Sequence, residues 1–257
     1  MDQLKKINSL QSFVGKLKGK KVFLRADFNV PIEKGVITDA YRIDAVISTL
    51  DFLQHEGAVT IIASHIETAD SPSPTLKPVF EYIKKEYPKF NIVFCEDFLN
   101  SEVLTATVQS CVEGSFVLLE NIRNAKETVS EKDNSVQLAE YLKEYCDFYI
   151  QEAFAVSHRS HASVDALPRL FAHECKAAGF LLSKEIEHLS LGLVPRKPLA
   201  TILSGMKFST KLPLIQKYLE MADMLFVGGA LFNNIAKSMG CNVGQSLIDT
   251  EATDIDQ

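Results

Sequence analysis

Two rhythms of apolar and polar positions alternate along the chain. The first consists of short apolar runs rich in β-branched residues, and several of them are apolar throughout, as in strands buried on both faces. The predicted strands are Lys21–Ala26, Val59–His65, Asn91–Cys95, Ser115–Glu120, Asp147–Gln151, Leu199–Leu203 and Met224–Gly228.

The second rhythm has helical period and fills the gaps between these runs. Ile43, Val46, Ile47, Leu50 and Leu53 follow the i, i+3, i+4, i+7 spacing after Thr38 and Asp39, which are candidate caps. Similar segments cover residues 77–86, 103–112, 136–145, 211–221 and 231–238. Repeated strand and helix units predict an α/β fold, a Rossmann-like three-layer αβα arrangement around a parallel sheet. Ligands of such sheets bind beyond the carboxyl ends of the strands.

A change in pattern near residues 184–198 predicts a domain boundary. A helical segment from Ser183 to Leu189 precedes Gly192 and the turn-rich run Pro195-Arg196-Lys197-Pro198. We therefore expect an N-terminal domain over 1–185, a hinge helix and linker over 186–198, and the start of a second α/β domain over 199–257. Two strands and two helices are too few to bury a good core alone, so the second domain is expected to be incomplete.

Composition narrows the class of protein. The chain is 46% apolar and 23% charged, with a net charge of -6, which argues against broad nucleic-acid binding. The five cysteines form no Cys-x-x-Cys, so neither a disulfide framework nor a zinc site is indicated, and no metal-binding residues are assigned. Neither a signal peptide nor an apolar run of bilayer length is evident. We expect a cytoplasmic monomer without membrane or nucleic-acid partners.

Arginine placement adds the first chemical indication. Only six of the 27 basic residues are arginines, and Arg25, Arg42, Arg123 and Arg159 lie where predicted strands end or helices begin. The planar guanidinium binds carboxylates and phosphates through paired hydrogen bonds. This placement favours a site for a small anion, with chance placement in loops as the alternative.

Polar residues follow the first strands in the same way. Asp27 and Asn29 suit an oxygen-rich ligand beside Arg25, although a capped turn is the alternative. His65 ends the second strand, where a structural role is the more common one. His158, Arg159 and His161 crowd one loop, which fits an anion clamp better than a metal site.

A second group of signals lies after residue 203. Ser204-Gly205-Met206-Lys207 and the following residues to Lys211 form a glycine turn that leads from a strand to a helix. Gly228-Gly229 follows the next strand and permits close approach of a ligand. Backbone N–H groups and lysines in such turns suit phosphate, so the pattern indicates a nucleotide on the second domain.

These segments, in this order, resemble the phosphoglycerate kinase family over essentially the whole chain. The resemblance rests on Arg-Ala-Asp-Phe-Asn-Val-Pro (25–31), Ile-Thr-Asp-Ala-Tyr-Arg-Ile (37–43), Leu-Leu-Glu-Asn-Ile-Arg (118–123), Ala-Phe-Ala-Val-Ser-His-Arg-Ser-His-Ala-Ser (153–163), Ala-Gly-Phe-Leu (178–181), Lys-Phe-Ser-Thr-Lys-Leu (207–212) and Gly-Gln-Ser-Leu (244–247). The family transfers a phosphoryl group reversibly between 1,3-bisphosphoglycerate and ADP with Mg²⁺, giving 3-phosphoglycerate and ATP in glycolysis.

The resemblance implies a role for each matching residue. Residues expected to bind phosphoglycerate are Asp27, Asn29, Arg42, His65, Arg123, His158 and Arg159, with Arg25 in the same basic patch. Those expected to bind nucleotide are Lys207, Lys211, Gly228 and Gly229. Arg42 and Lys211 are expected to be catalytic, Arg42 as the arginine nearest the transferred group and Lys211 by steadying it.

The chain departs from the family pattern in several respects, including at 151–156 and at Ser204-Gly205, and two of the departures bear most on binding. The family sequence Ser-His-Leu-Gly-Arg-Pro is replaced by Ser-His-Ile-Glu-Thr-Ala at 64–69, which removes an arginine near Thr68 and adds Glu67 near an anion site. The family segments for adenine, for nucleotide phosphates and for the Mg²⁺ aspartate lie beyond Gln257, so ADP or ATP would bind only with a completed second domain. The chain is expected to be a truncated kinase, with a non-catalytic phosphoglycerate-binding remnant or half of a split enzyme as alternatives.

Overall fold

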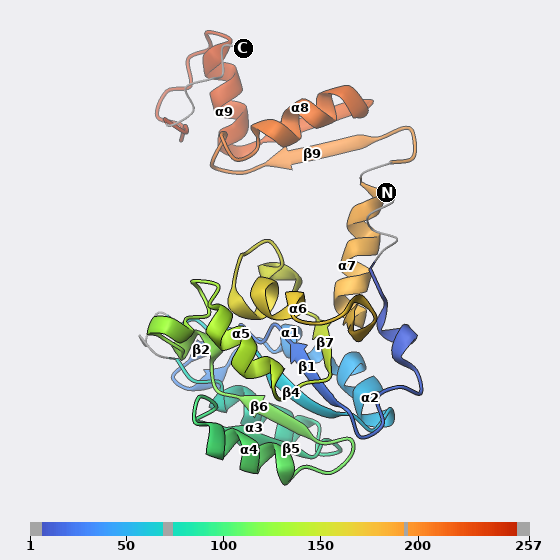
Figure 1. Cartoon of the computed structure of the whole chain (residues 1–257). Coiled ribbons are helices and arrows are strands. Elements are labelled where there is room, and N and C mark those ends of the chain that lie inside the picture. The colour runs from blue at the N-terminus through green and yellow to red at the C-terminus, as the bar shows by residue number, and fades with distance from the viewer. Residues whose placement is uncertain (1–6, 69–73, 193–194, 251–257) are drawn as a thin grey trace. The chain divides into compact units, whose positions relative to one another are not determined.

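The computed structural model describes residues 7–68, 74–192 and 195–250 (Figure 1). Contacts divide the chain into two units, Met1–His188 and Leu189–Gln257. This division falls three residues beyond the expected end of the first domain. Each unit is described separately below, and they are called unit 1 and unit 2.

Unit 1 is built on a parallel sheet of six strands in the order β5-β6-β4-β1-β7-β8. The strands are β1 (Lys21–Arg25), β4 (Val59–Ala63), β5 (Ile92–Cys95), β6 (Phe116–Leu119), β7 (Phe148–Gln151) and β8 (Lys176–Ala178). Each of the first five was predicted from its apolar run. β8 was missed because its sequence, Lys-Ala-Ala, has neither the length nor the β-branched residues of a strand.

Two apolar cores cover the two faces of this sheet. Val22 and Leu24 of β1 belong to one core, and Phe23 between them belongs to the other. Such alternation follows from the two-residue period of a strand, and it explains why both sides of β1 read as apolar. The predicted three-layer αβα fold is confirmed.

Helices form the outer layers of unit 1 (Figure 1). They are α1 (Tyr41–Asp44), α2 (Ile47–His55), α3 (Lys77–Glu86), α4 (Ser101–Gln109), α5 (Val136–Lys143), α6 (Leu167–Arg169) and α7 (Phe180–Leu191), the last of which crosses the boundary between the units. Asn100 and Ser135 cap α4 and α5 by accepting backbone N–H groups of the first turn. The one helix expected over 43–53 is two helices, and Asp39 accepts the backbone N–H of Tyr41 before the first of them.

A short hairpin and several single turns complete unit 1. Strands β2 (Ile32–Glu33) and β3 (Val36–Ile37) pair antiparallel around Lys34 and Gly35, both of which have positive φ. Two-residue hairpin turns of this kind require positive φ at both positions. The single turns are Leu10–Phe13, Ile122–Asn124, Glu127–Val129, Phe154–Val156, Ala162–Ala166 and His173–Cys175.

Unit 2 contains two parallel strands, β9 (Ala200–Ser204) and β10 (Met224–Gly228), and two helices, α8 (Leu212–Met221) and α9 (Gly229–Ser238). All four elements were predicted. Its core is small: Phe208, Ile215 and Leu231 are buried, and a few partly buried neighbours pack against them.

Candidate functional site

The carboxyl ends of β1, β4, β6 and β7 lie at one edge of the unit 1 sheet, since the strands are parallel and hydrogen-bonded in register. The chain leaves this edge through the four segments 26–31, 64–68, 120–124 and 152–161. These segments contain most of the residues predicted to bind phosphoglycerate, so the topology brings them to one edge as expected.

Asp27 and Arg42 form the most direct pair at this edge. Arg42 Nη1 donates to Asp27 Oδ2 at 2.9 Å, and the Arg42 side chain is 46% exposed. Asp27 Oδ1 also accepts the backbone N–H of Asn29, and Asn29 Oδ1 accepts the backbone N–H of Glu67 at 2.9 Å. Asp27 therefore orients a guanidinium that remains accessible to a ligand.

Arg25 is fully buried and is not presented to solvent. Its guanidinium donates to Ser163 Oγ at 2.7 Å and to the Ala26 carbonyl at 2.6 Å, and its Nη2 lies 4.0 Å from Glu131 Oε1. Burial lowers the pKa of Arg25, while the charge of Glu131 opposes that shift. Within unit 1, Arg25 supports the site from beneath instead of lining it.

His65 is held by Arg25 in a neutral form. Arg25 Nη2 lies 3.2 Å from His65 Nδ1, and since arginine can only donate, Nδ1 accepts and the proton is on Nε2. Burial, followed by the positive charges of Arg25 and Arg123, lowers the pKa of His65 to about 2. The imidazole is therefore a neutral hydrogen-bonding group across the physiological pH range.

Arg123 lines a hollow of about 170 Å³ at the end of β6. Its side chain is only 6% exposed, and its Nη1 donates to the carboxylate of Glu67. Lys132 Nζ lies 3.5 Å from the same carboxylate oxygen of Glu67. The glutamate that replaces the family glycine thus contacts one of the predicted anion-binding arginines.

His158 and Arg159 are exposed on the segment after β7. Arg159 stands two residues before His161, which belongs to the cluster. His158 precedes Arg159 on the same exposed loop.

Two further buried residues belong to the cluster: Glu131, which was not predicted, and His161, which was predicted only as part of the loop with His158 and Arg159. Glu131 accepts the backbone N–H and the hydroxyl of Ser163, at 2.8 and 2.5 Å, and faces Arg25. His161 is 7% exposed, and its Nδ1 lies 4.0 Å from Glu131 Oε1 with no hydrogen-bond partner among the described residues. Glu131 lies in a polar stretch whose sequence is typical of a solvent-exposed loop, so the local sequence does not predict it as a buried site residue.

Glu152, also at the end of β7, anchors the start of α7 within unit 1. Its carboxylate accepts the hydroxyl of Thr49 and the backbone N–H groups of Leu181 and Leu182. A Cβ at Gly179 would lie 2.1 Å from Glu152 Oε2, so the approach requires glycine. Burial raises the pKa of Glu152, and its hydrogen bonds oppose that shift.

The turns predicted to bind nucleotide lie together within unit 2. The Leu231 backbone N–H donates to the Gly205 carbonyl at 3.2 Å, which joins the loop after β9 to the start of α9. Gly229 has φ +60, and a Cβ there would lie 3.0 Å from Ser204 Oγ. Lys211 precedes α8 and Lys207 is exposed, so both lysines belong to the loop after β9.

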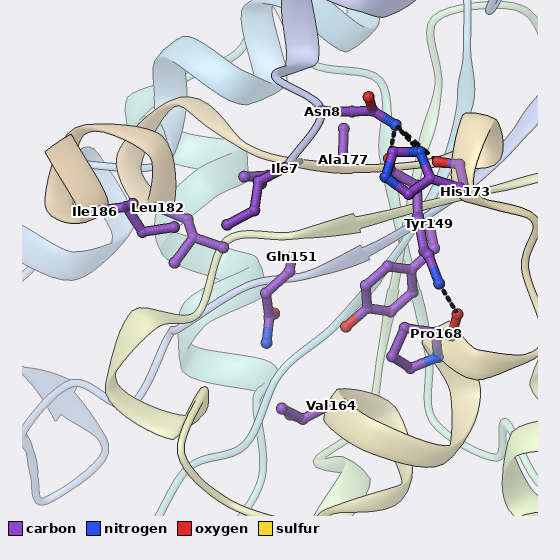
Figure 2. Close-up of a pocket in the computed structure, with 12 residues that line it drawn as sticks. Ile7, Asn8, Tyr149, Gln151, Val164, Pro168, His173, Ala177, Leu182 and Ile186 are labelled. Atoms are coloured by element: carbon purple, nitrogen blue, oxygen red, sulfur yellow. Dashed lines mark hydrogen bonds between the residues drawn. The ribbon is translucent and has the colours of Figure 1, made fainter. Parts of the chain in front are cut away.

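Another hollow in unit 1, of about 300 Å³, lies beside β8 (Figure 2). Its wall is largely apolar and includes Leu182 and Ile186, while Asn8 Nδ2 reaches His173 Nδ1 at 3.1 Å. None of the predicted site residues lines it. It is therefore separate from the cluster described above.

The described part of the chain has no evident set of side chains that would bind Mg²⁺. Mg²⁺ prefers carboxylate and water oxygens, yet no group of three or more His, Cys, Asp or Glu side chains is arranged there for a metal. Asp249, the acidic residue beside the loop after β9, accepts the Phe208 backbone N–H at 2.7 Å. The described residues therefore do not fit a resident Mg²⁺ ion.

Comparison with known proteins agrees with the α/β fold described above. The family model for phosphoglycerate kinase matches residues 11–257. The chain belongs to the phosphoglycerate kinase family, as the sequence resemblance predicted.

Relatives and solved structures carry the same description. The chain is 38% identical to the phosphoglycerate kinase of Leptospira biflexa over 91% of its own length, and 36% identical to that of Geobacter metallireducens over 93%. The phosphoglycerate kinase structure from Coxiella burnetii matches 97% of this chain with a TM-score of 0.79 and 31% identity. The chain spans 58% and 60% of the two relatives and 61% of the solved chain.

In the described residues, no helix has the length and apolar character needed to cross a membrane.

Proposed function

We propose that this chain carries the phosphoglycerate-binding half of a phosphoglycerate kinase, which transfers the acyl phosphate of 1,3-bisphosphoglycerate to ADP and yields 3-phosphoglycerate and ATP. The observation that supports it most is the cluster at the carboxyl edge of the unit 1 sheet, where Arg25 contacts a neutral His65 while Arg42 and Arg123 pair with Asp27 and Glu67. The cytoplasmic location and the monomeric state remain predictions.

The proposed roles follow from exposure and contact. Arg42, oriented by Asp27 and half exposed, would face the phosphoryl group, while Arg123 would bind an anionic oxygen of the substrate. His65 and Asn29 would supply neutral hydrogen bonds to the glycerate oxygens. Arg25, enclosed at 0% exposure, would hold His65 in place without contacting substrate.

Phosphoryl transfer depends mainly on positioning and on neutralising developing charge, so guanidinium groups are the expected means of catalysis. Lys211 and Lys207 would meet the nucleotide phosphates, with Gly228 and Gly229 allowing close approach. Mg²⁺ is proposed as the counter-ion of bound ADP or ATP, and none of the described residues is assigned to hold it.

A binding remnant is the second candidate, and one specific observation favours it. Glu67 pairs with Arg123 and places a negative charge where the substrate anion is expected. If the site retains binding but the chain has no turnover when its full nucleotide half is present, the remnant is the better description.

The test is calorimetric titration of 3-phosphoglycerate into the wild-type chain, Arg42→Ala and Lys77→Ala. Lys77 is an exposed cation that pairs with Glu96 at 3.4 Å and is not among the predicted site residues. Loss of a charge-assisted contact weakens affinity by about 10- to 100-fold in Arg42→Ala. Equal affinities of the two variants would contradict the proposed site.

A further inference from the structure

Glu67 stands in this pocket as a carboxylate that the protein itself supplies. Its carboxylate forms an ion pair with Arg123 and lies 3.5 Å from Lys132. It therefore pairs with both cations at the hollow. We propose that Glu67 is an internal counter-ion which the substrate anion displaces, and that Lys132 then serves as the second cation of the site in place of the arginine absent at Thr68. This inference rests on the proposed function.

The frame around Arg123 is rigid. Asn121, 1% exposed, accepts the Arg123 backbone N–H at 3.2 Å and donates to the carbonyls of Ile66 and Pro74, each at 2.9 Å. The Arg123 side chain is itself 6% exposed. The Arg123 backbone is therefore held by a buried hydrogen bond, and its side chain is already largely desolvated.

The Glu67 side chain, in contrast, is 56% exposed, so its carboxylate can move into solvent without disturbing the core. Lys132 is 59% exposed and can follow an incoming anion in the same way. An exchange of one carboxylate for another anion thus leaves the buried guanidinium paired throughout.

The pocket has spare room and spare donors. Its volume of about 170 Å³ is several times the share of one water molecule, which is about 30 Å³, so a tetrahedral oxyanion fits. Arg123 Nε is buried and has no hydrogen-bond partner among the described residues. Glu67 alone therefore does not use the full donor capacity of the guanidinium.

The charges predict the direction of the effect. Arg123 and Lys132 contribute two positive charges and Glu67 one negative charge, which leaves the pocket at +1. Although partial burial acts to raise it, the pKa of Glu67 is held below its usual value by the charge and hydrogen bond of Arg123 and by Lys132. Glu67 is thus ionised at neutral pH and competes with an incoming anion.

The experiment measures binding of 3-phosphoglycerate and, separately, of inorganic phosphate to Glu67→Gln, Glu67→Gln/Lys132→Ala and wild type by calorimetry. Glu96→Gln and Lys77→Ala are matched controls, since they break an exposed ion pair elsewhere on unit 1. We expect Glu67→Gln to tighten binding about two- to fivefold, because an exposed competing pair is weak, and Lys132→Ala to reverse that gain.

The outcomes separate this inference from the proposed function. If Glu67→Gln matches Glu96→Gln while Arg42→Ala still loses 3-phosphoglycerate, the inference is wrong and the function stands. If no variant binds 3-phosphoglycerate but Glu67→Gln binds phosphate more tightly than Glu96→Gln, the function is wrong and the counter-ion role stands. Absence of both ligands from Glu67→Gln overturns both.

Discussion

Strands of similar composition have different environments in the two units. In unit 1, Val22 of β1 and Ile61 of β4 are 0% and 1% exposed because helices cover both faces of a six-stranded sheet. In unit 2, Ile202 of β9 and Phe226 of β10 face each other in register yet are 77% and 52% exposed. An apolar run predicts a strand, but only neighbouring strands and helices bury it.

The largest expected effect is a difference in local stability between the two units, since unit 2 has only a small core. Backbone amides of β1 and β4 are expected to exchange more slowly than those of β9 and β10, by about a hundredfold or more, since unit 2 can open without unit 1. Hydrogen exchange read by mass spectrometry or NMR measures this. Equal protection in the two sheets would contradict the comparison.

Single substitutions to alanine, one in each unit, test the same difference in burial. Leu24→Ala in β1 removes a fully buried side chain and is expected to cost about 2–5 kcal/mol of unfolding free energy. Ile202→Ala is expected to change stability by less than about 0.5 kcal/mol, because the side chain already lies in solvent. Urea denaturation of both variants checks the pair, and a large loss in Ile202→Ala would show that this face is covered.

The buried hydroxyls of Thr49 and Thr60 test how much a hydrogen bond inside unit 1 contributes to the free energy of unfolding. Thr49 is fully buried, donates to Glu152 and accepts the Phe180 backbone N–H at 3.2 Å. Thr49→Val removes one of the hydrogen bonds to the Glu152 carboxylate and the Thr49 acceptor of the Phe180 backbone N–H, and is expected to cost about 1–3 kcal/mol.

Thr60 is the matched control, since it is equally buried and its Oγ1 has no hydrogen-bond partner among the described residues. Thr60→Val is therefore expected to be neutral or stabilising. Similar losses in both variants, measured by urea denaturation, would mean that the Glu152 bonds do not matter.

His65 provides a pH-dependent effect with a defined window. Its pKa is lowered from 6.5 to about 2 in the folded protein, so the unfolded chain binds a proton that the folded chain does not. Its contribution to stability is full above pH 6.5 and is lost progressively as the pH falls toward 2, by at most about 1.4 kcal/mol per pH unit.

NMR of the His65 imidazole nitrogens tests the shift directly. The ring should remain neutral at pH 5, with the proton on Nε2. A titration midpoint near 6 would show that Arg25 and burial do not control this ring.

Much of the fold followed from the sequence because strand and helix periods are local. The apolar run at 59–65 predicted β4, and the helical pattern at 77–86 gave the bounds of α3. The β2–β3 hairpin around Lys34 and Gly35 was missed, because each strand has only two residues and a short run has no measurable period.

The site was predictable only in part. The resemblance identified Asp27, Arg42 and Arg123, and the strand order brought their segments together. Two ion pairs of the site, Arg25 with Glu131 and Lys132 with Glu67, join residues more than 60 positions apart in sequence. Neither the amino-acid composition nor the hydrophobic period of the sequence predicts such long-range pairs.

We propose that unit 1 binds phosphoglycerate and that residues 199–257 alone do not hold a nucleotide. The most direct test is calorimetric titration of the 257-residue chain with 3-phosphoglycerate and, separately, with ADP and Mg²⁺. We predict measurable binding of 3-phosphoglycerate and little or none of ADP. Binding of ADP without 3-phosphoglycerate, or binding of neither, would contradict the account.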